Sequence, residues 1–435
     1  GIDVFDIEVN ETDVDKFVEV VAALEPTFGG INLEDIKAPE CFEIERKLKE
    51  RLAIPVFHDD QHGTAIVVAA ATLNGLSIVG KNIENVKIIV SGAGAAAIAC
   101  LNLLVSLGAQ KKNIYVCDSK GVIHSEREGK LDFSKQQYCQ TTAYRTLDDA
   151  IENADIFLGL SGPNTVSQDS IRKMAPNPLV FALANPTPEI MPELVIEARP
   201  DAIMATGRSD YPNQVNNALC FPYIFRGALD CGATAINEAM KVAAVHAIAN
   251  LAKMEPNEMV TSAYGGQELC FGREYLIPKP LDPRLIEVIA PAIAKAAMES
   301  GIATRPIDDF NAYAQKLNEY VYRSSMIMRP IVNAAKLRPM RIVICEGEDE
   351  RALLAVSEIK ELKLARPIII GRPFVIEKKN KKLGLKIEAG VDFELVNIEN
   401  DYRYKALWQR YYQLTKRKGV TEETARDHML TRRTL

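Results

Sequence analysis

The stretch VSGAGAAAIACLNLL, residues 90–104, decides the fold. It places the pattern GxGxxA directly after a short apolar run and at the start of an apolar helical pattern. The first glycine allows a tight turn, the second lets a pyrophosphate approach the backbone, and the small third residue permits close packing of helix on strand. We therefore predict that a dinucleotide binds at the N-terminus of this helix, against Gly92, Ala93, Gly94, Ala95 and Ala97.

From about residue 80 onward, short apolar runs alternate with helical patterns. They are VKIIVSG (86–92), NIYVCD (113–118), DIFLGL (155–160), LVFALA (179–184) and AIMATG (202–207). Strands this apolar are buried on both faces, and helices between them imply right-handed parallel crossovers. The predicted fold class is α/β, with a doubly wound, Rossmann-like parallel sheet.

Polar residues follow two of these runs. Asp118 ends the second run, which is the usual place for an acid that binds the ribose, but Ser119 and Lys120 follow at once and could hold a 2′-phosphate. The choice between NAD and NADP stays open on spacing alone. Ser161 and Gly162, in the loop LGLSGPNTV, are expected to flank the nicotinamide, and the alternative is a plain turn.

Length and patterning predict more than one domain. A chain of 435 residues favours two to three domains. Residues 1–75 mix strand-like and helical pieces, and residues 230–335 read as mostly helical. A new strand, MRIVICEG (340–347), opens a separate α/β unit. The chain begins on glycine, so we expect a fragment of a longer protein.

Composition excludes several classes of protein. The chain is 47% hydrophobic and 25% charged, as soluble globular proteins are, and its net charge of -6 argues against nucleic-acid binding. Eight scattered cysteines without a CxxC pair fit reduced thiols in the cytoplasm. We see no signal peptide and no apolar run long enough for a bilayer, so no membrane partner is expected.

Two pairs of adjacent carboxylates predict a metal site. Glu34 and Asp35 precede Asp59 and Asp60 by about 25 residues, and such a cluster is costly unless a cation neutralises it. Oxygen ligands indicate Mg²⁺ or Mn²⁺. The alternative is that Asp59 or Asp60 only caps the following helix.

His58 and His62 have the spacing of a zinc pair on one helical face. We expect residues 58–63 to form a loop instead, because they are polar and end on glycine, and no glutamate stands between the histidines in the manner of zinc peptidases. The two rings are then packed or hydrogen-bonded beside the acidic site.

Taken together, five motifs in order resemble the malic enzymes, specifically the bacterial hybrid type fused to a phosphotransacetylase-like domain. The motifs are INLEDI (31–36), FHDDQHGTA (57–65), SGAGAAA (91–97), FALANPTPEI (181–190) and ATGRSDYPNQVNN (205–217). RIVICEGEDERALLA (341–355) looks like the opening of the phosphotransacetylase domain. The resemblance implies part of the metal and substrate domain in 1–75, the NAD(P)-binding domain in 76–335 and a partial phosphotransacetylase-like domain in 336–435.

The resemblance also implies roles for residues. Glu34, Asp35 and Asp60 would be the metal ligands, Asp59 an acid beside the general base, and Asn185 and Asn217 substrate ligands, with Asn185 also near the cofactor. The implied reaction is oxidative decarboxylation of malate to pyruvate and CO₂ with Mg²⁺ or Mn²⁺. The stretch VCDSKG favours NADP over NAD. A homo-oligomer and regulation by acetyl-CoA are further expectations.

By the same resemblance, the tyrosine and lysine that do the proton transfers lie upstream of the position of Gly1. We expect weak or no turnover from these 435 residues alone, because the proton donor and acceptor would be absent. The alternative is a noncatalytic module that senses dinucleotide or acetyl-CoA and supports assembly. Malate-dependent NAD(P)H formation with Mn²⁺, compared with a chain extended upstream, tests this, and equal rates would contradict it.

Overall fold

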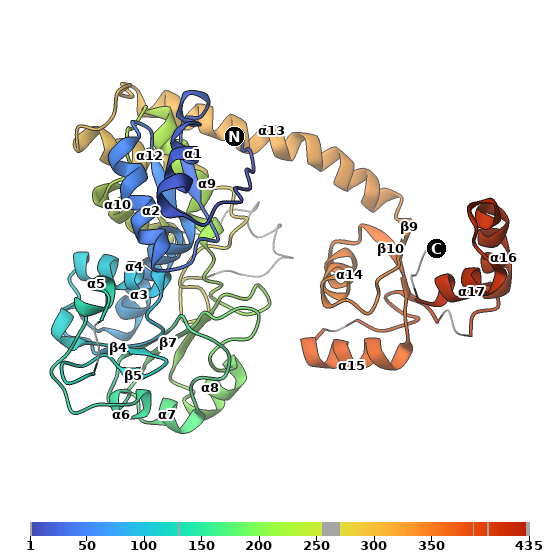
Figure 1. Cartoon of the computed structure of the whole chain (residues 1–435), viewed down its shortest axis with the longest axis horizontal. Helices are drawn as coiled ribbons and strands as arrows, with labels where there is room; N and C mark the ends of the chain where they lie inside the picture. The colour runs from blue at the N-terminus through green and yellow to red at the C-terminus, as the bar shows by residue number, and fades with distance from the viewer. Residues whose placement is uncertain (1, 129–130, 255–269, 386, 398–399, 432–435) are drawn as a thin grey trace. The chain divides into compact units, whose positions relative to one another are not determined.

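The computed structural model describes residues 2–128, 131–254, 270–385, 387–397 and 400–431. The chain divides into two compact units, Gly1–Val321 and Tyr322–Leu435. Figure 1 shows the course of the chain through both, and each unit is described by itself. The predicted domain bounds at 75 and 335 stay predictions.

The first unit contains a six-stranded sheet of order β5-β4-β3-β6-β7-β8. The five predicted strands are confirmed as β3 (Ile88–Ser91), β4 (Ile114–Asp118), β6 (Ile156–Gly159), β7 (Leu179–Ala182) and β8 (Ile203–Thr206), all parallel. A short antiparallel strand, β5 (Gly121–Val122), joins the edge beside β4. If the six strands are numbered 1 to 6 in chain order starting from β3, their order in the sheet is 3-2-1-4-5-6. The switch point of this arrangement lies between β3 and β6.

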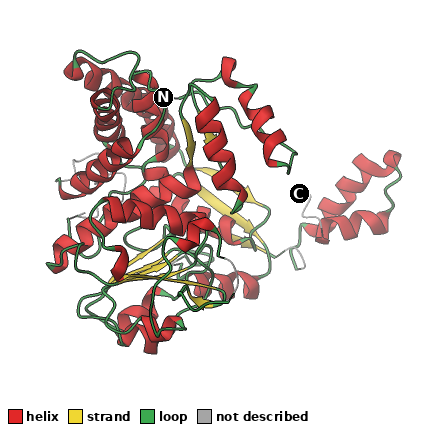
Figure 2. Ribbon diagram, turned by 60° about the vertical axis from the view of Figure 1, so that its left-hand side comes forward, coloured by secondary structure: helices red, strands yellow, loops and turns green. Residues whose placement is uncertain are grey.

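The sheet is buried on both faces because its strands carry apolar residues at successive positions, and polar residues stand mainly at their carboxyl ends. Ile88 and Val90 belong to one core, and Ile89 between them belongs to the other. The first core contains α3 (Thr64–Val79), α4 (Ala95–Ser106), α9 (Phe221–Asp230), α10 (Glu238–Lys253) and α12 (Leu285–Glu299). The second contains α6 (Leu147–Ala150), α7 (Gln168–Arg172) and α8 (Pro192–Ala198). Figure 2 shows helices on both sides of the yellow strands.

The N-terminal segment forms a small layer with its own core. It contains α1 (Val14–Ala22), η1 (Glu25–Thr27), β1 (Ile31–Leu33), α2 (Glu40–Arg51) and β2 (Val56–His58). β1 and β2 pair in parallel, with Leu33 opposite His58. Both strands therefore end at the same edge, and the two acidic pairs follow directly from it.

The prediction of a loop over residues 58–63 is wrong. Asp59–Gly63 forms a π-helical turn, η2, that runs directly into α3. The polar residues that favoured a loop are held by residues distant in sequence: His62 bonds Glu45, and Asp59 bonds Asn217. Turns of this kind recur at functional sites.

The combined helical segment Asp59–Val79 is long and apolar enough to span a membrane. In its most apolar window, however, 67% is buried inside the protein, against the sheet and neighbouring helices. Burial in the core explains this composition, since a helix that is apolar all round belongs in the interior of a large domain.

The remaining elements are helical connections and the second unit. The connections are η3 (Lys111–Asn113), α5 (Phe133–Gln136), η4 (Asn217–Leu219) and α13 (Phe310–Leu337). The second unit has a parallel sheet of order β11-β10-β9, made of β9 (Met340–Ile344), β10 (Ala365–Ile370) and β11 (Glu394–Val396). Its helices are α14 (Glu350–Leu362), α15 (Pro373–Leu383), α16 (Tyr404–Thr415), η5 (Lys416–Lys418) and α17 (Glu422–Thr431).

One ion pair fastens the start of β8 to the neighbouring turns. The Asp201 carboxylate accepts hydrogen bonds from Arg199 Nε and Nη2, both at 2.8 Å, and from the Asn177 N–H at 2.7 Å. The Arg199 guanidinium holds the pKa of Asp201 well below its usual range, although burial opposes this. Arg199 also donates to the carbonyls of Met174 and Ala175.

We expect Asp201→Asn to lower the melting temperature at pH 7 by about 2 to 4 °C, since this partly exposed pair is screened by solvent and worth roughly 1 kcal/mol. A carboxyl group whose folded pKa is depressed stabilises the fold above its unfolded pKa of about 4. The difference between wild type and variant should therefore shrink as the pH falls below that value. Melting curves from pH 3 to 7 measure it, and a gap independent of pH would contradict the assignment.

Candidate active site

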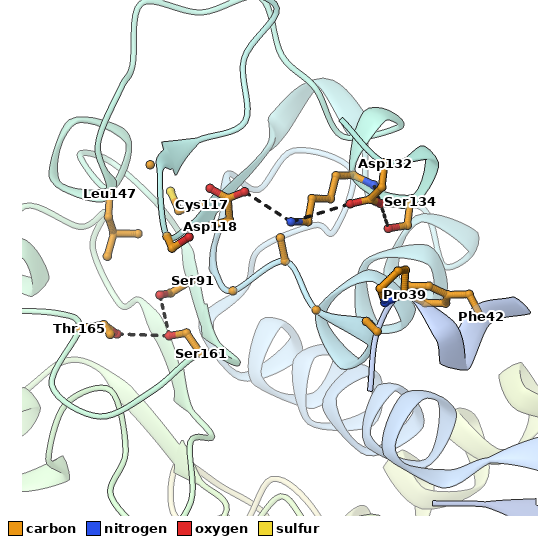
Figure 3. Close-up of a pocket in the computed structure, with 17 residues that line it drawn as sticks. Pro39, Phe42, Ser91, Cys117, Asp118, Asp132, Ser134, Leu147, Ser161 and Thr165 are labelled. Carbon is orange, nitrogen blue, oxygen red and sulfur yellow. Dashed lines mark hydrogen bonds and ion pairs between the residues drawn. The ribbon is translucent and has the colours of Figure 1, made fainter. Parts of the chain in front are cut away.

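A cavity of about 600 Å³ opens at the carboxyl ends of β3, β4 and β6, at the switch point of the sheet (Figure 3). Six of the predicted cofactor residues line it: Gly92, Ala93, Gly94, Asp118, Ser119 and Ser161. Ligands in open α/β sheets bind in this position. The cavity is therefore the place where the fold would hold a dinucleotide.

The glycine-rich turn fits tightly between the neighbouring strands. Gly92 has φ +109°, and a Cβ there would overlap the Leu160 carbonyl oxygen. Its N–H donates to the Cys117 carbonyl at 2.8 Å. Ser91 Oγ and Ser161 Oγ are 2.9 Å apart across the switch point. Only glycine suits this backbone conformation and this close approach.

A fully buried carboxylate, Glu189, joins the two loops on the β6 and β7 side of the cavity. Its Oε1 accepts a hydrogen bond from the Ser161 N–H at 2.8 Å, and its Oε2 accepts one from the Ala184 N–H at 3.0 Å. A Cβ at Gly159 would lie 2.5 Å from the Glu189 carboxyl carbon, so glycine is required there. Glu189 thus fixes the loop that carries Ser161 relative to the loop that leads to Asn185.

At the other end of the cavity, Asp118 is surrounded by donors. Arg127 donates to both carboxylate oxygens, and the Lys120 N–H donates to Oδ1 at 2.9 Å. Lys135 Nζ lies 3.5 Å from Oδ2. Burial alone would raise the pKa of Asp118, but the hydrogen bonds and positive charges hold it below its usual value. Asp118 is a carboxylate at neutral pH, and its charge is already balanced.

The two acidic pairs meet where β1 and β2 end. The Asp35 N–H donates to Asp60 Oδ2 at 2.9 Å. Asp35 adopts φ 55°, in the left-handed region that aspartate tolerates better than most residues. Parallel pairing of the strands thus brings together residues 25 positions apart in sequence.

Asp59 is the most perturbed of these acids. Its side chain is buried, and Asn217 Nδ2 donates to its Oδ2 at 2.5 Å. Burial, with the negative charges of Glu34 and Asp60, raises the pKa of Asp59 to about 7. Within the described residues its buried Oδ1 has no hydrogen-bond partner.

The two histidines have the packing role that we predicted for them. His62 Nε2 and Glu45 Oε1 are 2.7 Å apart, and His58 is buried with Nδ1 3.8 Å from Asp60 Oδ2. Burial would raise the pKa of Glu45, but His62 and Lys49 bring it down to about 2. Across the described ranges, no group of three or more histidine, cysteine, aspartate or glutamate side chains is arranged around a common metal position.

The structure brings most of the predicted residues to one region. Ala38, Pro39 and Phe42, just after the first acidic pair, line the dinucleotide cavity, which connects the two predicted sites. Lys120, Gly162 and Asn185 lie outside its lining, and Ala95 and Ala97 belong to α4 behind the turn. Sequence reasoning missed Arg127, Lys135, Glu189 and Glu45. Of these only Glu189 lay in a quoted motif, FALANPTPEI.

Comparison with known proteins agrees with this geometry. Residues 61–262 match the family described as "Malic enzyme, NAD binding domain", residues 5–49 match "Malic enzyme, N-terminal domain", and residues 326–435 match "Phosphate acetyl/butaryl transferase". The crystal structure of a malic enzyme from Pyrococcus horikoshii has 37% sequence identity and a TM-score of 0.67, covering 75% of this chain and 74% of that one. The chain belongs to the malic enzyme family.

Curated members of the malic enzyme family match the whole chain. An NADP-dependent malic enzyme from Escherichia coli is 64% identical over 436 residues, covering 100% of this chain and 57% of its own length. An NAD-dependent malic enzyme from Rhizobium meliloti is 58% identical, with the same coverage of both chains. The chain therefore spans a little over half the length of these relatives, and the order of its domains confirms the hybrid type.

We expect Glu189→Gln to weaken NADPH binding by about tenfold, because the carboxamide would turn an NH₂ group toward one of the two loop N–H donors. Glu152→Gln makes the same chemical change at an exposed position and should leave binding unchanged. Isothermal titration calorimetry on folded protein measures both. Equal affinities in the two variants would show that Glu189 does not position the cofactor loops.

Proposed function

We propose that the protein takes part in the divalent-metal-dependent oxidative decarboxylation of malate to pyruvate and CO₂, with NADP as the cofactor and NAD as the alternative. The observation that carries this proposal is the meeting of two acidic pairs at the end of β1 and β2, next to the dinucleotide cavity. A redox cofactor beside an oxygen-rich cation site is what a metal-assisted hydroxy-acid oxidation requires.

The carboxylates of this edge suit Mg²⁺ or Mn²⁺ both in their ligand atoms and in their closeness to one another. Glu34, Asp35 and Asp60 offer only oxygen ligands, which these hard cations prefer. The Asp35 backbone already contacts the Asp60 carboxylate, and the charge of Glu34 reaches Asp59. Glu34 and Asp35 are exposed, and in the part of the chain that the structure describes no three such side chains surround a common position. We propose that these three residues hold the cation.

Asn217 and Asn185 are the proposed substrate ligands. Asn217 is held by Asp59 and therefore lies beside the acidic cluster, where its amide can donate to a substrate carboxylate. Asn185 is exposed in the loop after β7, three positions beyond the strand, and the Glu189 carboxylate fixes the backbone just before it. Asn217 comes from η4, so the two amides are supplied by different connections of the sheet.

The chain's own residues would bind and orient the substrate. Asp59 holds the Asn217 amide beside the acidic cluster through a hydrogen bond, and it is the proposed acid beside the general base. Pro39 and Phe42 narrow the cavity on the side of the N-terminal layer. When bound, the divalent ion and the dinucleotide supply the Lewis acid and the electron acceptor for oxidation at C2 and loss of the C4 carboxylate.

Other expectations stay proposals of the same kind. A homo-oligomer and regulation by acetyl-CoA through the second unit are predicted from the family resemblance, and a cytoplasmic location is predicted from the scattered, unpaired cysteines. The match of residues 326–435 to an acyltransferase family supports a role for the second unit in recognising an acyl carrier.

We expect Asp60→Asn to weaken Mn²⁺ binding by at least about tenfold, because it removes the charge of a ligand in an oxygen-only site. NADPH binding should stay within a factor of about two, since Asp60 does not line the cofactor cavity. Electron paramagnetic resonance of free Mn²⁺ measures the first quantity, and calorimetry measures the second.

The matched control is Asp308→Asn, an equal loss of charge at an exposed position. The proposed cation site would be contradicted if Asp60→Asn left the Mn²⁺ affinity unchanged, or if both variants weakened it equally.

A further inference from the structure

The π-helical turn η2 is held by side chains from two distant elements. Asn217 of η4 donates to Asp59 Oδ2 at 2.5 Å, and Glu45 Oε1 on α2 lies 2.7 Å from His62 Nε2. A π-helical turn has a wider hydrogen-bond ring than an α-helical one and rarely extends beyond a single turn. The direction in which η2 presents its acids therefore depends on these two side-chain contacts.

The contact between α2 and η2 belongs to a buried chain of polar groups. The Glu45 side chain is 9% exposed, and its Oε1 also pairs with Lys49 Nζ at 2.6 Å, one turn further along α2. On the other side of the imidazole, Lys241 Nζ of α10 faces His62 Nδ1 at 3.5 Å. An ammonium group can only donate, so Nδ1 is the acceptor and Nε2 carries the proton that is donated to Glu45.

This contact joins the two halves of the proposed cation site. The first half, with Asp35, lies just before α2, and the second half, with Asp60, lies on η2. The hydrogen bond from the Asp35 N–H to Asp60 Oδ2 links them directly at 2.9 Å. Glu45 adds a second link, because it lies on α2 and its partner His62 is two residues beyond Asp60.

The imidazole of His62 has little freedom to find another acceptor. Its ring packs on Phe57 with the centroids 5.5 Å apart, and Phe57 in turn packs edge-on against Phe225 of α9. Only 15% of the His62 side chain is exposed. Without Glu45, the Nε2–H group would be a buried donor without its acceptor, which is costly. A shift of η2 would relieve that cost and would displace Asp60.

We infer that Glu45 is a positioning residue of the cation site, which holds η2 through its hydrogen bond with His62 so that the Asp60 carboxylate stays beside Asp35. This inference rests on the proposed cation site and adds a supporting residue to it. Glu45 supports the ligands and is not one of them, since its own contacts are with His62 and Lys49. Groups that orient the ligands of a metal contribute to its affinity.

The test replaces Glu45 in the 435-residue chain. Glu45→Ala should weaken Mn²⁺ binding by about tenfold, the low end of the cost of removing a group that supports metal ligands. Glu45→Gln keeps a carbonyl acceptor for the His62 N–H and should stay within about threefold of wild type. NADPH binding should change by less than about twofold in both, because Glu45 does not line the cofactor cavity. Electron paramagnetic resonance of free Mn²⁺ and calorimetry measure the two affinities.

Two further variants separate this hydrogen bond from a general effect of charge. Glu50→Ala removes the same charge from an exposed position on the same helix and should bind Mn²⁺ as wild type does. Adding His62→Ala to Glu45→Ala should weaken binding by less than about a further twofold, because both substitutions break the same bond. Melting curves check that each variant is folded.

The possible outcomes distinguish the two proposals. The role of Glu45 is overturned, while the cation site stands, if Glu45→Ala binds Mn²⁺ as wild type does or if Glu45→Gln is as weak as Glu45→Ala. An equal loss in Glu50→Ala, or a parallel loss of NADPH affinity, overturns it as well. If wild type does not bind Mn²⁺, or if Asp60→Asn binds it equally well, the proposed cation site fails, and the role of Glu45 fails with it.

Discussion

The pairing of β3 with β4 on one side and β6 on the other is the constraint on which the rest of the site depends. The chain connections on the two sides of β3 run in opposite directions. A gap therefore opens at the carboxyl ends of β3, β4 and β6, and it is determined by the strand order and not by the local sequence. The glycine-rich turn enters that gap from β3, Asp118 from β4 and Ser161 from β6. Asp118 ends its strand, and Gly92 and Ser161 lie one and two positions beyond theirs, so burial of the strands on both faces fixes where these residues lie.

The parallel pairing of β1 with β2 carries an electrostatic cost that the pairings of β3 do not. It places four carboxylates at one edge, and the burial of Asp59 strengthens the repulsion that this side chain experiences from its neighbours. The raised pKa of Asp59 is the visible result. Strand pairing, and not attraction between the side chains, holds these acids together, which is why a cation is the natural complement to this edge.

The features that could be predicted from the sequence are those that follow from hydrophobic periodicity and from the positions of strand ends. The run LVFA is apolar at every position and IIVS at all but its last, so their burial in a parallel sheet followed without tertiary information. The acidic pairs and the glycine motif were found for the same reason, since each directly follows a strand. The π-helical turn at Asp59–Gly63 was missed because its polar residues find partners far away in sequence. Lys135 and Arg127 lie in a long connection whose course no periodicity reveals.

Two acids near the cavity, Glu189 and Asp118, differ in the partners that surround them. Glu189 is fully buried and meets only neutral donors from two loops, so its hydrogen bonds are spent on holding those loops. Asp118 stands at the edge of the cavity and is balanced by the cationic side chains of Arg127 and Lys135. The two acids thus differ in the kind of donor that surrounds them. Neutral donors at Glu189 join two loops, whereas charged donors at Asp118 balance its negative charge on the cavity wall.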